Sequence, residues 1–233
     1  MNANKLLALC LTVCLTIILS QPLNAAKKKK VDLNFVLQKV VVEPTSPGGN
    51  ISVNSEARTF NDDIISVTWK PDPKGFHFEL VNKANHSVSI IWDKCAYINE
   101  NGESHRVMHS EVRFIKKEEA IVPTVVPLQA KVQDVVFPTP YARFGATWQS
   151  VGEKIWTLEP LYSVKDIEKK YRKDKKIDLT WRVILALEIK EAIYNYHFFF
   201  NASAKIICPY CNNEIAPDEV KCPKCSFKSA VFK

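Results

Sequence analysis

The sequence predicts a mainly β protein, a sandwich of two antiparallel sheets with one short helix and a small separate unit at the C-terminus. Apolar and polar residues alternate in several segments, which is the pattern of strands that have one face in a core. Prolines gather between these segments, as they do in the turns of all-β proteins. The composition of the 233 residues, 46% hydrophobic and 24% charged, excludes a disordered, collagenous or polytopic membrane protein.

The N-terminal segment, residues 1–26, has features of both a secretory signal peptide and a membrane anchor. Lys5 precedes an apolar run over residues 6–19, which is shorter than the roughly 20 residues of a bilayer-spanning helix. The small residues Ala25 and Ala26 favour cleavage after one of them, so we expect an exported protein. The lysines at residues 27–30 instead favour keeping the following chain in the cytoplasm. An uncleaved anchor with a cytosolic body is therefore the alternative.

The body of the chain, residues 27–203, is predicted to be the β-sandwich. Its clearest strand covers residues 177–189, where every second residue from Ile177 to Ile189 is apolar. Three consecutive strands, at residues 76–80, 88–98 and 104–109, are expected to form an antiparallel meander. The dipeptide Asn101-Gly102 predicts a two-residue hairpin within it. Further strands are predicted at residues 33–42, 64–70, 128–137, 155–158 and 193–201.

One segment of the body has helical spacing and is predicted to be a short surface helix. It covers residues 164–173, where Val164, Ile167 and Tyr171 lie three and four positions apart among lysines and glutamates.

Three short runs in the body carry a resemblance to a known family. They are Phe78-Glu79-Leu80-Val81-Asn82-Lys83, Ile90-Ile91-Trp92 and Val136-Phe137-Pro138-Thr139. They resemble the immunoglobulin-like domains of exported bacterial envelope proteins, over about residues 64–160. The resemblance implies an immunoglobulin-like β-sandwich that is exported and has no defined activity; its motifs are structural rather than catalytic.

The C-terminal segment, residues 204–233, contains the most specific chemical motif of the chain. It reads Cys208-Pro209-Tyr210-Cys211, then ten residues, then Cys222-Pro223-Lys224-Cys225. Each Cys-x-x-Cys turn directs two sulfurs toward one ion, and two such turns supply a tetrahedral set of four thiolates. The spacing resembles short zinc ribbons with Cys-Pro-x-Cys pairs, so we expect Cys208, Cys211, Cys222 and Cys225 to bind a structural Zn²⁺. Four thiolates fill the coordination sphere, which argues against a catalytic ion.

Two other interpretations of these cysteines are open. An oxidising compartment would favour two disulfides in place of the metal. A redox-active Cys-x-x-Cys motif is the third interpretation, although such motifs usually begin a helix in a βαβ unit, which this sequence does not predict. The total of seven cysteines is odd, so a complete intramolecular disulfide framework is excluded.

A second metal site near His105 and His109 is not expected. Residues four apart on a strand lie about 13 Å from each other, too far to share an ion, although Asp93, Cys95 and Glu111 are close in sequence. We expect surface or partly hydrogen-bonded histidines, and a buried Cys95. The sequence also lacks a Gly-x-Ser-x-Gly elbow, a phosphate-binding loop and a dinucleotide fingerprint, so we expect no enzymatic activity.

The net charge of +7 is concentrated in two places, and this weakens the case for a nucleic-acid partner. Residues 27–30 carry four lysines, and residues 165–176 carry seven basic against three acidic side chains. We therefore expect a non-enzymatic envelope protein with a structural or protein-binding role, exported or in contact with the membrane through its N-terminus. The alternative is a cytosol-facing, membrane-anchored zinc-ribbon protein that binds nucleic acid or the translation machinery.

Overall fold

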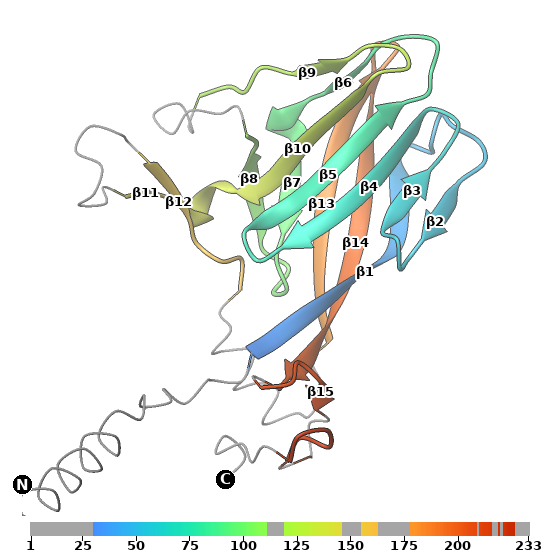
Figure 1. Cartoon of the computed structure of the whole chain (residues 1–233). Coiled ribbons are helices and arrows are strands. Elements are labelled where there is room, and N and C mark those ends of the chain that lie inside the picture. Colours follow the sequence, from blue (N-terminus) through green and yellow to red (C-terminus); the bar gives the residue numbers. More distant parts are fainter. Residues whose placement is uncertain are drawn as a thin grey trace, which may run out of the picture. The chain divides into compact units, whose positions relative to one another are not determined.

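The structure is a computed structural model that describes residues 30–110, 119–145, 155–162, 178–208, 210–215, 219 and 221–226 (Figure 1). Backbone contacts divide it into two units: a barrel unit over residues 31–205, and a second unit that includes residues 206–215 and residues from 219 on. The predicted leader over residues 1–26, the predicted helix over residues 164–173, and Glu111 lie outside the described residues.

The barrel unit consists mainly of antiparallel strands, which confirms the predicted mainly β fold class. Within the described residues, helical backbone is limited to two short 3-10 turns, η1 (Trp92–Lys94) and η3 (Thr139–Tyr141), and no helix is long and apolar enough to cross a bilayer. The strands are β1 (Lys30–Glu43), β2 (Ser52–Asn54), β3 (Thr59–Asn61), β4 (Ile65–Asp72), β5 (Gly75–Asn82), β6 (Val88–Ile90), β7 (Ala96–Ile98), β8 (Ser104–Met108), β9 (Thr124–Val126), β10 (Lys131–Pro138), β11 (Ala142–Gly145), β12 (Ile155–Leu158), β13 (Asp178–Ile189), β14 (Ala192–Ile207) and β15 (Glu214–Ile215).

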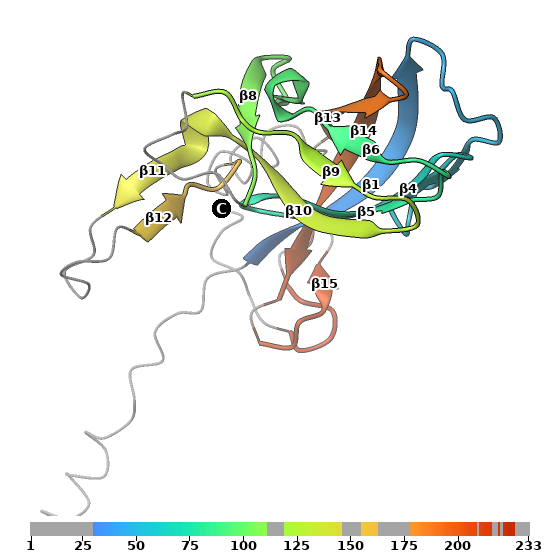
Figure 2. The same cartoon turned by 90° about the horizontal axis from the view of Figure 1, so that it is seen from above.

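One continuous sheet curls until its two ends meet. Its strand order is β1-β14-β13-β7-β8-β10-β5-β4-β3-β2, while β11 and β12 pair separately. The backbone N–H of Leu37 in β1 donates to the carbonyl of Ser55, just after β2, at 3.2 Å. Arg58 Nη1 donates to the carbonyl of Phe35 at 3.1 Å, which adds a second link between the ends. The sheet is therefore nearly barrel-shaped (Figure 2), and the two predicted layers are opposite walls of it.

Aromatic side chains from the opposite walls fill the interior. Trp69 in β4 packs edge-on against Phe198 in β14, with ring centroids 4.9 Å apart. Phe76 in β5 lies at the same centroid distance from Phe200 in β14. All four rings are at most 1% exposed. Burial of rings of this size is the main stabilising contribution to such a unit, about 3–5 kcal/mol for each ring when it is truncated to alanine.

Strand β13 has the predicted alternation. The apolar residues of one face, Leu179, Trp181, Val183, Leu185, Leu187 and Ile189, are all buried. Its neighbour β14 follows through a tight turn, in which Lys190 and Glu191 have φ angles of 49° and 67°. Such two-residue turns usually contain Asn or Gly, because other residues are strained at positive φ.

The predicted meander is only partly correct. Strands β7 and β8 pair as expected, but β5 pairs with β4 and β10 and not with β6. Instead, β6 and β7 both pair with β13, and the turn η1 separates them. The predicted strand over residues 88–98 is thus two strands, and the chain crosses to the other wall before the first of them. Alternation identifies the buried face of a strand but not its neighbour, which explains the error.

The Asn101-Gly102 hairpin has a three-residue loop rather than the predicted two-residue loop. The N–H of Asn99 donates to the carbonyl of Glu103, and the N–H of Gly102 donates to the carbonyl of Asn99, both at 3.0 Å. Gly102 has a φ of 81°, whereas Asn101 is not in the positive region. The side chain of Asn99 accepts the N–H groups of Asn101 and Glu103, which favours the longer loop.

Candidate metal centre

The second unit contains two tight turns, which we call the first knuckle (residues 208–211) and the second knuckle (residues 222–225). Strand β14 ends at Ile207, directly before the first knuckle, and β15 returns beside it through the pairs Ile206↔Ile215 and Ile207↔Glu214. The N–H of Cys208 donates to the carbonyl of Asn213 at 2.9 Å, which closes the turn. This short hairpin therefore positions the first two cysteines.

The two knuckles share one backbone pattern. In the first, the N–H of Asn212 donates to the carbonyl of Cys208 at 3.0 Å; in the second, the N–H of Ser226 donates to the carbonyl of Cys222 at 2.8 Å. The donor is four residues after the first cysteine in each case, and it has a positive φ, 55° for Asn212 and 57° for Ser226. A pattern that occurs twice at equivalent positions indicates two matched halves of a single site.

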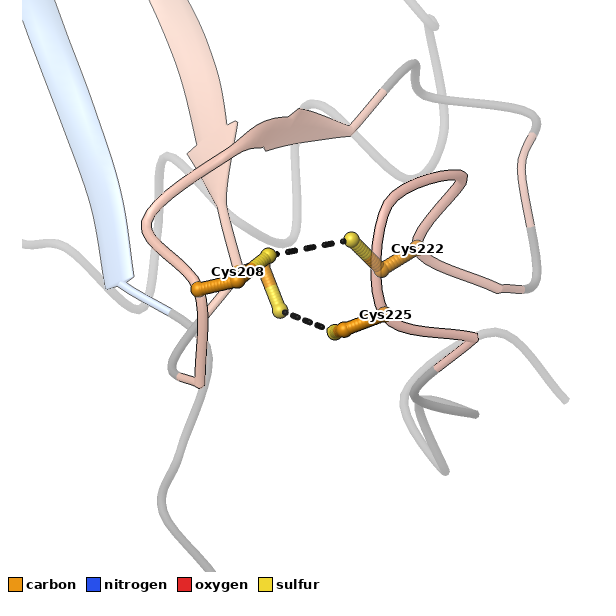
Figure 3. A group of neighbouring side chains, drawn as sticks. Cys208, Cys222 and Cys225 are labelled. Atoms are coloured by element: carbon orange, nitrogen blue, oxygen red, sulfur yellow. Dashed lines mark hydrogen bonds between the residues drawn. The ribbon is translucent and has the colours of Figure 1, made fainter.

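The sulfur atoms of Cys208, Cys211, Cys222 and Cys225 converge, as the sequence predicts. All four lie within 4.8 Å of one another. Cys208 Sγ is 3.5 Å from Cys225 Sγ (Figure 3), and Cys211 Sγ is 3.4 Å from Cys222 Sγ. A tetrahedral zinc ion with bonds of about 2.3 Å sets sulfur–sulfur separations of roughly 3.8 Å. For the four sulfurs to hold an ion of this size, the facing pairs would separate by about 0.3–0.4 Å and the widest separations would close by up to about 1 Å.

Backbone amides favour the ionised form of the first cysteine in each knuckle. Burial alone would raise the pKa of Cys208, but the N–H groups of Tyr210 and Cys211 donate to its sulfur and lower the pKa below its usual value. The pKa of Cys222 is also lowered. Burial would raise it, but the sulfur accepts hydrogen bonds from the N–H groups of Cys225 and Lys224, and these outweigh the effect of burial. The donors are again two and three residues after the cysteine. Thiolates are the form in which cysteine binds a metal.

The second cysteine of the first knuckle behaves differently. The N–H of Asn213 lowers the pKa of Cys211, but burial and the nearby thiols of Cys222 and Cys208 outweigh it, and the pKa is raised. Without a cation, the closeness of the sulfurs therefore disfavours the state in which all four cysteines are thiolates. A divalent cation removes this opposition.

Exposure differs within each knuckle. Cys208 and Cys222 are 0% and 1% exposed, Cys211 is half-buried, and Cys225 is exposed. The first cysteine of each knuckle is thus shielded from solvent, and the second is more accessible.

The residues around His105 and His109 do not converge on an ion. Asp93 pairs with Arg106 at 2.7 Å, and Cys95 is buried, where its sulfur accepts the N–H of Ala186. Among the described residues, the four C-terminal cysteines are the only group of three or more Cys, His, Asp or Glu side chains that could hold a metal ion.

His109 is buried, which the sequence prediction of a surface or partly hydrogen-bonded side chain missed. It is 4% exposed, stacks on Trp92 at 4.2 Å between ring centroids, and its Nδ1 lies 3.0 Å from Asp134 Oδ2. Asp134 also accepts the N–H of Ser110 at 2.9 Å. The sequence contained a signal for this burial. Asp134 lies two residues before Val136 in β10, so both side chains are on the inward face of the strand. A carboxylate at such a position predicts a buried partner.

Asp62 is a second buried carboxylate that the sequence did not single out. It is 1% exposed and accepts hydrogen bonds from the hydroxyls of Tyr196 and Ser46 at 3.0 and 3.1 Å. It also accepts the N–H groups of Ile64 and Ile65. Its role is to join the start of β4 to β14 and to the loop after β1.

Comparison with known protein families, curated proteins and solved structures finds no match for this chain, so the immunoglobulin-like resemblance stays a prediction.

Proposed function

We propose that the second unit is a zinc ribbon in which Cys208, Cys211, Cys222 and Cys225 hold one structural Zn²⁺. The observation that supports it best is the duplicated knuckle, in which the same hydrogen bond from an amide N–H to a carbonyl and the same hydrogen bonds from amides to sulfur occur twice. Four sulfurs within 4.8 Å of one another match the donor number and compactness of a tetrahedral thiolate site. Zinc and iron are the metals that such a set prefers, and zinc adds no redox chemistry.

We further propose that the protein is non-enzymatic and that the ribbon contacts a protein partner. The position two residues after the first cysteine carries Tyr210 in the first knuckle and Lys224 in the second, and both side chains are exposed. Tyr210 is 53% exposed. Tyrosine is enriched at protein interfaces because its ring is apolar and its hydroxyl forms hydrogen bonds. The ion would fix the backbone that presents these two side chains.

Our proposal for location is the bacterial envelope, on the strength of the leader-like residues 1–26. The test is the N-terminal sequence of the native protein. A chain that starts at Ala26 or Lys27 supports export. A chain that retains Met1 and is digested only by protease added from the cytoplasmic side contradicts it.

The metal proposal is tested by elemental analysis of protein purified without added metal. We expect about one zinc per chain, and loss of that zinc in Cys225→Ser, which removes one thiolate. Cys95→Ala is the matched control, because Cys95 is a buried thiol of the barrel unit, and it should retain the zinc. Protein without zinc, or red protein that contains iron, contradicts the assignment.

A further inference from the structure

The sulfur contacts in the ribbon run between the knuckles and pair the cysteines in a defined way. Cys208 and Cys225 face each other with hydrogen-bond geometry (Figure 3). Cys211 and Cys222 have the same relation, with their sulfurs 3.4 Å apart. These pairs span 17 and 11 residues of sequence. From 3.4–3.5 Å, each pair must approach by about 1.4 Å to reach an S–S bond of about 2.05 Å. Side-chain rotation can supply a movement of this size.

Each of these pairs also combines one buried cysteine with one that is more exposed, and we call them the shielded and the accessible member. Cys225 is exposed and faces buried Cys208, and half-buried Cys211 faces buried Cys222. A small oxidant reaches the accessible member first, and the shielded member is then in place to complete a disulfide.

We propose that the ribbon is a site of thiol oxidation by peroxides, which converts it to a metal-free form closed by two crossed disulfides, Cys208–Cys225 and Cys211–Cys222. The proposal rests on the zinc ribbon only for the ion that is released; the disulfide pairing follows from the sulfur positions alone. The zinc site and the pair of disulfides, which are alternatives in the sequence analysis, would then be the reduced and oxidised states of one site.

The chemistry balances for each disulfide. The accessible thiolate attacks one oxygen of hydrogen peroxide, the O–O bond breaks, and a sulfenic acid and hydroxide form. The shielded thiolate then attacks the sulfenic sulfur; the S–S bond forms, the S–O bond breaks, and a second hydroxide leaves. The two sulfurs together lose two electrons, and one peroxide becomes two waters after protonation. Zn²⁺ keeps its charge and leaves, since no thiolate remains to bind it.

Crossed pairing has a structural consequence that pairing within a knuckle lacks. Each crossed disulfide ties one knuckle to the other, as the metal does. The ribbon would therefore stay closed in both a reducing and an oxidising compartment.

The test is a peroxide titration of the full chain with zinc bound, followed by digestion without reduction. Trypsin cuts after Lys205, Lys221, Lys224 and Lys228, and chymotrypsin cuts after Tyr210, so each of the four cysteines falls in its own peptide. We expect the peptide with Cys208 linked to that with Cys225, the peptide with Cys211 linked to that with Cys222, and one zinc released per chain. In Cys225→Ser, we expect only the link between Cys211 and Cys222.

Cys95 is the internal control, because burial raises the pKa of its thiol to about 12 and it should stay reduced. Links within a knuckle, sulfinic acids without disulfides, or oxidation that leaves zinc bound would each overturn the proposal. Disulfide mapping of the metal-free chain after peroxide treatment separates the two proposals. Absence of zinc from the starting protein refutes the zinc-ribbon assignment. The mapping still shows whether the crossed disulfides form.

Discussion

The barrel unit and the four-cysteine unit, which we propose to be a zinc ribbon, are expected to be stabilised in different ways. The barrel encloses rings such as Trp69 and Phe200, and its apolar interior needs no ligand. The ribbon instead places two polar knuckles around four sulfurs, with Ile215 as its buried aliphatic side chain among the described residues. Burial grows with chain length, so a segment of this size depends on a metal or on cross-links, whereas a barrel of this size does not. The two units should therefore fail under different treatments.

The largest expected effect is loss of the ribbon in Cys208→Ser or after chelation. Metal binding supplies the folding free energy of such units, on the order of 10 kcal/mol, so the knuckles should lose order completely. Hydrogen exchange should show fast exchange at residues 210–215 and 221–226, while near-ultraviolet circular dichroism of the barrel tryptophans stays unchanged. Loss of both signals together would contradict independent stabilisation of the two units.

Phe200→Ala tests the stability of the barrel unit. It should lower the free energy of unfolding of the barrel by about 3–5 kcal/mol, measured by urea denaturation, without changing zinc content. Phe199→Ala is the matched control in the same strand, because Phe199 is half-buried on the other face, 4.6 Å from Lys39 Nζ. Its cost should be less than half as large. Equal costs for the two variants would refute the assignment of the inner face.

A third prediction concerns the buried pair of His109 and Asp134. Burial would raise the pKa of Asp134, but hydrogen bonds from His109 and from the N–H groups of Ser110 and Val135 outweigh it and hold the pKa below its usual value. A carboxyl with a lowered folded-state pKa stabilises the protein above its unfolded pKa of about 3.9, and this contribution is lost as the pH falls through the folded-state pKa.

Asp134→Asn should therefore cost about 1–3 kcal/mol at pH 7 and make stability less dependent on pH in the acid range. Urea denaturation between pH 7 and pH 3 measures both effects. Glu56→Gln, at an exposed position, is the control and should leave the pH profile unchanged. A variant profile parallel to that of the parent would show that the Asp134 carboxylate does not contribute.

The smallest expected effect is a gain in stability at the turn between β13 and β14. Glu191 has a φ of 67°, which costs a residue with a side chain about 1 kcal/mol relative to glycine. Glu191→Gly should therefore raise the unfolding free energy by about 0.5–1 kcal/mol, measured as a higher urea midpoint. Glu188→Gly, inside β13, should lower it.

Much of this organisation follows from the sequence, and the gaps have physical causes. The alternation in β13 predicts its buried face because the pattern is long and unbroken. The crossing from β5 to β6 is not predicted, because strand neighbours depend on contacts far apart in sequence. The turn at Lys190 and Glu191 lacks Asn and Gly, so it carries no local signal.

For the cysteine site, the sequence predicts which residues come together but not how they are paired or how exposed each one is. Spacing alone predicts that Cys208, Cys211, Cys222 and Cys225 converge, because each Cys-x-x-Cys turn is local. Which cysteine is shielded and which sulfurs face each other depend on how the knuckles meet. The spacing of the cysteines therefore does not predict the contact between Cys208 and Cys225.

The pairing of β1 with β14 sets a condition on how the barrel assembles during synthesis. The partner of β1 at residues 30–43 is β14 at residues 192–207, so this seam joins two of the most widely separated strands of the chain. While the ribosome is still adding the segment between them, the sheet has an open edge and exposed apolar residues. Closure must wait until β14 has been made, so the sheet cannot be completed before nearly the whole chain has been synthesised.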